Sequence, residues 1–133
     1  MLNIRPDIAA LLLRSTLGLT LLAHGLLKIF VFTLPGAAGF FESVGFPGWA
    51  AYIVAPLEIV SGVALIIGLQ SRIAALCALP VLLGALTVHA RNGWVFTSPN
   101  GGWEFPAVLV LMAACVVFSG GGPYSVMQPK LDK

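Results

Sequence analysis

The stretch IAALLLRSTLGLTLLAHGLLKIFVF, residues 8–32, is the clearest indication of the fold class. It is apolar apart from a few hydroxyl groups and the ionisable side chains of Arg14, His24 and Lys28. A helix that crosses a membrane needs roughly 17 to 25 predominantly apolar residues, so this stretch predicts a spanning helix. An ionisable group in hydrocarbon costs at least several kcal/mol unless it is paired or faces a cavity, which makes each of these residues a candidate site residue.

The composition places the rest of the chain in the same environment. Of its 133 residues, 59% are hydrophobic and 9% are charged, whereas soluble domains carry about 25% charged residues. Further apolar stretches cover residues 50–69, 73–89 and 105–120. We therefore expect one integral membrane domain over residues 1–133, an all-α, four-transmembrane-helix bundle in the lipid bilayer. The net charge of +2, without a basic run, does not favour a nucleic-acid partner.

The distribution of basic residues predicts the orientation. Four spans place both termini and the tight turn at residues 70–71 on one side of the membrane. That side carries the larger share of the basic residues, namely Arg5, Arg72, Lys130 and Lys133, against Lys28 and Arg91 on the other. Because cytoplasmic loops are enriched in Lys and Arg, we expect both termini to be cytoplasmic.

Two long connections, residues 33–48 and 91–103, then lie on the outer side. The first is rich in Gly, Pro and Phe and the second contains several Gly and a Pro, so both are expected to be long loops. All three tryptophans, Trp49, Trp94 and Trp103, fall on this side. They predict either an aromatic belt at the membrane surface or a lid or docking surface for a partner.

The ionisable residues converge in depth on the outer half of the predicted bundle. His24 and Lys28 lie about 24 and 30 Å from the cytoplasmic start of the first span, and Glu58 lies about 12 Å from the outer start of the second. His89 ends the third span and Glu104 begins the fourth at the same side. We therefore expect these five side chains to form one polar cluster.

One face of the first span carries most of its unusual residues. At about 100° per residue, a single arc of roughly 120° holds Arg14, Gly18, His24, Gly25 and Lys28. Glycines on such a face permit close helix packing, so the face is expected to contact partner helices rather than lipid. Arg14 and Arg72 lie near the cytoplasmic side as structural polar residues, and the Arg14 side chain is expected to extend to the side of Arg5.

Imidazole, carboxyl and ammonium groups beside an aromatic rim suit the headgroup of a quinone. In this hypothesis His24 and Glu58 transfer protons, Lys28 and His89 polarise carbonyls, and Glu104 and Trp103 complete the binding site. Each residue also has an ordinary explanation, such as a lysine reaching the membrane surface or an acid at a helix N-terminus. A metal or haem is not favoured, since the Glu-x-x-His pairs of carboxylate-bridged bundles are absent.

The ordered series of motifs resembles the DoxX family of small four-helix membrane proteins. The series runs Arg14-x-x-x-Gly18, His24-Gly25-x-x-Lys28, Phe40-Phe41-x-x-x-Gly45-x-Pro47, Glu58-x-x-x-Gly62, Gly68-Leu69-x-x-Arg72, His89 and Gly101-Gly102-x-Glu104-x-Pro106. The acidic residue usual after a Ser such as Ser125 is missing. The resemblance implies a protein of the cytoplasmic (inner) membrane of a prokaryote, and family members serve quinone-linked sulfur oxidation or partner redox-stress proteins.

The leading hypothesis is a membrane redox component that binds quinone or a similar apolar redox molecule, in the manner of a subunit of a quinone-linked oxidoreductase. The first alternative is a non-catalytic membrane anchor for a redox-stress or sulfur-oxidising enzyme. The second is a small transporter or lipid-binding protein, which at this length would need a homo-oligomer to form a pathway.

Overall fold

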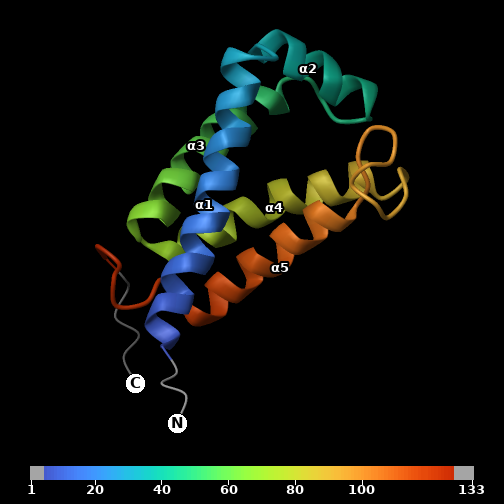
Figure 1. Ribbon diagram of the computed structural model, residues 1–133. Coiled ribbons are helices and arrows are strands. Elements are labelled where there is room, and N and C mark those ends of the chain that lie inside the picture. The colour runs from blue at the N-terminus through green and yellow to red at the C-terminus, as the bar shows by residue number, and fades with distance from the viewer. Residues whose placement is uncertain (1–4, 128–133) are drawn as a thin grey trace.

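The structure, a computed structural model, describes residues 5–127, and these residues form five helices (Figure 1). The helices are α1 (Pro6–Phe30), α2 (Leu34–Ser43), α3 (Ala50–Ile67), α4 (Ser71–His89) and α5 (Glu104–Ser119). The described part of the chain has no strand beyond an isolated bridge between Leu69 and Met127. The all-α class is therefore confirmed. Lys130 and Lys133, which entered the predicted orientation, lie outside the described residues.

The four predicted spans correspond to α1, α3, α4 and α5. Among the described helices, α1, α3 and α4 are long and apolar enough to cross a membrane. α5 is apolar but has 16 residues, which gives it a length of about 24 Å. That is shorter than the hydrocarbon core of a typical bilayer, about 30 Å.

The loop predicted over residues 33–48 is mostly helical, because Leu34–Ser43 form α2. Thr33 precedes this helix, and its hydroxyl accepts a hydrogen bond from the Gly36 backbone N–H at 3.3 Å. Pro35 lies in the first turn, where a residue without a backbone N–H starts a helix rather than breaking it. Gly45, with φ of 92°, ends the segment in a left-handed conformation.

The long helices form two antiparallel pairs, α1 with α3 and α4 with α5 (Figure 1). The pairs meet near the start of α1 and the α3–α4 turn, and they diverge toward the other end of the molecule. That other end holds α2 and the loop at residues 90–103, and is called the α2 end. The divergence leaves room between the pairs at the α2 end.

Glycine brings α1 and α3 together. A Cβ atom added at Gly18 would lie 2.7 Å from the Gly62 carbonyl oxygen, and one added at Gly62 would lie 2.7 Å from the Gly18 oxygen. Gly25 is equally close to α3, at Ala55 and Ile59. Helices in lipid associate through such close packing, since burial of apolar surface gives little advantage there.

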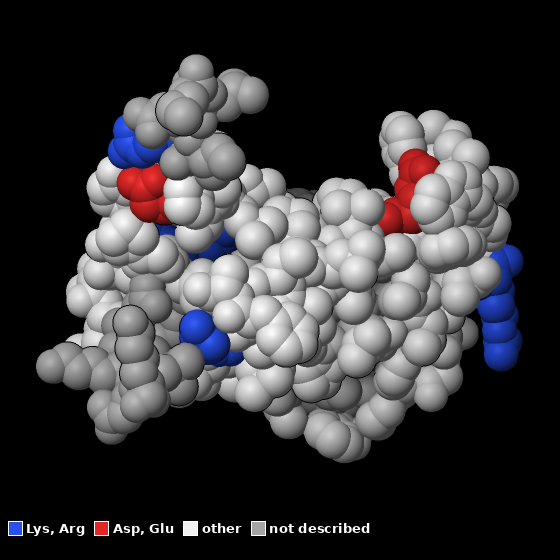
Figure 2. Space-filling view, turned by 90° about the horizontal axis from the view of Figure 1, so that it is seen from below, with Lys and Arg blue, Asp and Glu red and all other residues white. Residues whose placement is uncertain are grey.

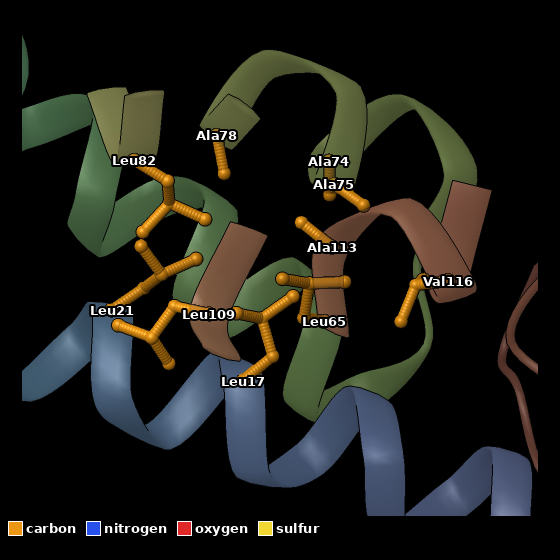
Figure 3. Packing of buried hydrophobic residues seen from close by; sticks show 10 residues of the cluster. All are labelled: Leu17, Leu21, Leu65, Ala74, Ala75, Ala78, Leu82, Leu109, Ala113 and Val116. Atoms are coloured by element: carbon orange, nitrogen blue, oxygen red, sulfur yellow. The ribbon is translucent and has the colours of Figure 1, made fainter. Parts of the chain in front are cut away.

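The core lies where the two pairs meet. Figure 3 shows its ten side chains, which come from all four long helices, namely Leu17, Leu21, Leu65, Ala74, Ala75, Ala78, Leu82, Leu109, Ala113 and Val116. The alanines belong to α4 and α5, and their small side chains allow these two helices to approach closely. This contact fixes the closed end of the molecule and leaves the α2 end open.

Arg14 does not extend to the aqueous side as expected, since its side chain is 1% exposed. Its guanidinium donates to the backbone carbonyls of Leu65 at 2.6 Å, Gly121 at 3.0 Å and Tyr124 at 2.8 Å, and also to that of Ile66. The last carbonyls of a helix have no partner within it and carry partial negative charge. Arg14 therefore caps α3 and connects the segment at residues 120–127 to it. These hydrogen bonds replace the hydration that the guanidinium would have at the aqueous side.

Arg72 has a related role on the second pair, because it donates to the Val117 carbonyl in the last turn of α5 at 3.3 Å. Charged side chains are otherwise few. On the face seen in Figure 2 they lie toward the two ends of the molecule, with an uncharged region between them. Cys77 and Cys115 are exposed free thiols and do not pair.

Candidate functional site

A cavity of about 1270 Å³ lies between the two helix pairs at the α2 end. All five helices contribute to its wall, together with residues from the loop between α4 and α5. Most of the lining side chains are apolar or aromatic. The polar exceptions include all five residues predicted to cluster, His24, Lys28, Glu58, His89 and Glu104.

Lys28 and Glu58 form an ion pair in the wall made by α1 and α3. The Lys28 Nζ lies 3.0 and 2.8 Å from the two Glu58 carboxylate oxygens, and the side chains are 17% and 7% exposed. The glycine contact at Gly25, one turn before Lys28, brings α1 close enough to α3 for this pairing. A charge pair this well buried is stable only while both partners remain, because removal of either leaves an uncompensated charge.

His24 lies one turn before Lys28 on the same wall. Its Nδ1 is 2.8 Å from the Thr20 carbonyl oxygen. Because a carbonyl can only accept, Nδ1 carries the hydrogen, and in the neutral ring Nε2 is left to accept a proton. The His24 ring centroid is 6.3 Å from that of Phe105 on α5, so the imidazole stands between the two helix pairs.

His89 and Glu104 organise the loop that closes the opposite wall. The His89 Nδ1 donates to the Gly101 carbonyl at 3.0 Å, which again leaves Nε2 as the acceptor. The Glu104 Oε1 accepts from the Phe96 backbone N–H at 3.0 Å. Two backbone bonds, Trp103 N–H to Gly93 and Glu104 N–H to Trp94, complete the loop. The Glu104 carboxylate is therefore hydrogen-bonded to the loop backbone, although the residue also lines the cavity.

Trp103 is not part of the cavity lining, whereas Trp94 is. The two indoles pack edge to face, with centroids 4.4 Å apart. From the sequence we expect Trp103 in the binding site, because both tryptophans are placed on the outer side and only the fold of the loop separates them. Phe40 and Phe41 of α2 also line the cavity. In the sequence they are recognised as part of a family motif but are not assigned to the site, because no helix is expected there.

Arg14 and Arg72 lie near the closed end and do not reach the cavity. No group of three or more His, Cys, Asp or Glu side chains within residues 5–127 is arranged to hold a metal ion. The arrangement instead offers an ammonium group, a carboxylate and two imidazoles to a mostly apolar molecule.

Comparisons with known proteins bear on this site. The family model described as DoxX matches residues 9–90, which is more than half of the chain and includes Lys28, Glu58 and His89. A protein of Bacillus subtilis (strain 168), named "Putative oxidoreductase CatD", is 32% identical over 115 residues, covering 86% of this chain and 81% of its own length. No solved structure matches the chain.

Proposed function

This chain belongs to the DoxX family, and from that premise we propose that it is a membrane redox component whose cavity binds a quinone or a similar apolar redox molecule. The observation that carries the proposal is the Lys28–Glu58 ion pair, which opens into an apolar cavity of about 1270 Å³. The printed name of the Bacillus subtilis relative, an oxidoreductase, supports the redox part.

The chemistry of the wall suits a neutral ring with polar oxygens. Lys28 has three N–H donors, of which two suffice for the Glu58 oxygens, so the third can donate to a ligand carbonyl. Because the charges of Lys28 and Glu58 cancel, the cavity wall at this point has no net charge, which suits an uncharged ligand. The apolar remainder of the cavity accommodates a hydrocarbon tail.

The remaining polar residues supply proton transfer and position. In this proposal Nε2 of His24 and the Glu58 carboxylate accept or return protons as the ligand is reduced or oxidised. His89 would polarise the ligand from the opposite wall as the imidazolium, in which Nε2 also carries a hydrogen, because in the neutral ring that nitrogen can only accept. Glu104 orients the ligand indirectly, since its carboxylate holds the loop that carries Trp94 and Phe96.

The proposed topology has four spans, with both termini in the cytoplasm of a prokaryote. α1 begins, α3 turns into α4, and the 120–127 segment ends at the same end of the molecule, where Met127 bonds Gln70. Arg5 and Arg72 lie there too, in accord with the enrichment of basic residues in cytoplasmic loops. The short α5 would then cross a locally thinned bilayer.

Thermal unfolding in lipid nanodiscs tests the ligand. We expect a short-chain benzoquinone or naphthoquinone to raise the melting temperature, because it binds the folded state alone. Glu58→Gln should abolish that shift, whereas the matched control Glu42→Gln, an exposed acid of α2 outside the cavity, should retain it. A shift that survives Glu58→Gln, or no shift with either quinone, would contradict the proposal.

The anchor alternative predicts a different result from the same preparation. A soluble redox enzyme would then co-purify in stoichiometric amount, and Glu58→Gln would leave the complex intact.

A further inference from the structure

A second, smaller cleft of about 370 Å³ lies between the end of α2 and the end of α4. Its polar wall is formed by Ser43, His89, Asn92 and Asn100. Its apolar wall is shared with the large cavity, since Phe40, Val44 and Val88 line both. His89 also lines both, so the cleft and the cavity meet at this imidazole.

The cleft can hold water. An enclosed water needs roughly 10–15 Å³ of free volume and two to four polar partners. The Ser43 hydroxyl donates to the Phe40 carbonyl at 2.6 Å and keeps its lone pairs for water. Asn92 donates through Nδ2 to the Asn100 carbonyl at 3.2 Å, which leaves its amide oxygen as an acceptor. Volume and polar groups therefore both favour a chain of waters here.

His89 is the one ionisable side chain among the described residues that line the cleft. Its Nδ1 is held by Gly101, so Nε2 is the nitrogen that exchanges a proton. The neighbouring ionisable groups do not line the cleft. The Glu104 carboxylate accepts a hydrogen bond from the Phe96 backbone N–H, and Glu42 and Arg91 are exposed.

We propose that the cleft is a water-filled inlet that carries protons between the aqueous phase and the large cavity, with His89 as the group that passes them on. A hydronium ion in the inlet gives its proton to Nε2 and becomes water. The imidazolium then gives that proton to a basic oxygen of the molecule in the cavity and returns to its neutral form. The second step rests on the proposed function, whereas entry of water does not.

Cysteine modification tests the inlet without any quinone. In a background with Cys77→Ala and Cys115→Ala, His89→Cys places a thiol at the junction, and Leu111→Cys places one on the exposed apolar face of α5. Both chains are treated in nanodiscs with a charged methanethiosulfonate. Since only the thiolate reacts and apolar surroundings suppress its formation, Cys at 89 should react at least ~10-fold faster.

Blocking the inlet provides the decisive comparison. Ser43→Trp should slow modification at position 89 by ~10-fold or more, because the indole fills the cleft, which in this proposal is the path of the charged reagent. Glu42→Trp, at the adjacent residue whose side chain lines neither cavity, should leave the rate unchanged. Equal rates at positions 89 and 111, or no effect of Ser43→Trp, would overturn the inlet.

A measurement on the intact histidine guards against misfolding of the cysteine variant. The chain has two histidines, so their ¹⁵N-labelled imidazole signals can be resolved in nanodiscs. A water-soluble paramagnetic chelate should broaden the His89 signal in the native chain and broaden it less with Ser43→Trp. An unaffected His89 signal would overturn the inlet, whereas an inlet found without a quinone-induced shift would overturn the proposed function alone.

Discussion

Lys28 and Glu58 form an ion pair in which each side chain is buried against the other. Their N–O distances of 2.8 and 3.0 Å give a bidentate ion pair of low exposure. Such a pair contributes little net stability when complete, yet its loss on one side is costly. We therefore attribute the presence of the pair to ligand binding rather than to folding.

Removal of one partner of the ion pair tests how much the pair contributes to folding. Lys28→Met should lower the free energy of unfolding by up to about 3 kcal/mol, since the Glu58 carboxylate then stays buried without a counter-ion. The double variant Lys28→Met/Glu58→Leu should recover most of that loss. Unfolding by SDS titration in mixed micelles measures both, with Arg91→Met, an exposed residue, as the control. A double variant as unstable as Lys28→Met would show that the pair itself holds the fold.

Depth along the predicted helices was enough to anticipate which ionisable residues border one cavity. It could not reveal what each side chain contacts. Glu104 and His89 bind loop backbone, and Trp94 rather than Trp103 faces the cavity. These contacts depend on the fold of the loop at residues 90–103, which has no periodic pattern. The contacts of Arg14 likewise could not be predicted, because they depend on residues 120–127 lying beside α3, and helix geometry alone does not give that position.

At the scale of elements, the α1–α3 contact depends on glycine. A methyl group at Gly62 would lie 2.7 Å from both the Gly18 oxygen and the Leu22 nitrogen, and backbone atoms cannot rotate away. Gly62→Ala should therefore separate the helices and cost about 1–3 kcal/mol. SDS unfolding again provides the measurement.

Gly39 of α2 is the matched control, because an added Cβ would meet nothing within 4 Å. Gly39→Ala should stabilise the protein by up to about 0.5–1 kcal/mol, the usual gain from replacing a helical glycine. Equal effects of the two substitutions would contradict the close approach of α1 and α3.

The helices with apolar periodicity were predictable, and α2 was not. Its sequence contains Pro35, Gly36 and Gly39, residue types with low helix propensity in the interior of a helix. In the structure Pro35 occupies the first turn, where it favours the helix, the two glycines are exposed, and α2 packs against α3. Tertiary contact thus decides an element that composition alone leaves open.

At the scale of the whole molecule, two helix pairs joined at one end create the cavity at the other. This arrangement also makes the number of spans testable. If α5 crosses the membrane with α1, α3 and α4, reporters fused to the N- and C-termini should both be active in the cytoplasm. A chain with the three long spans alone would place the two reporters on opposite sides of the membrane.

The central claim is that the cavity holds an apolar redox molecule against Lys28 and Glu58. The most direct measurement is the amount of quinone that the protein retains when it is purified from native membranes, quantified by mass spectrometry of an organic extract. We expect a near-stoichiometric amount for the native chain and only the background of co-purified lipid for Lys28→Met/Glu58→Leu. Equal quinone in both preparations, or none in either, would contradict it.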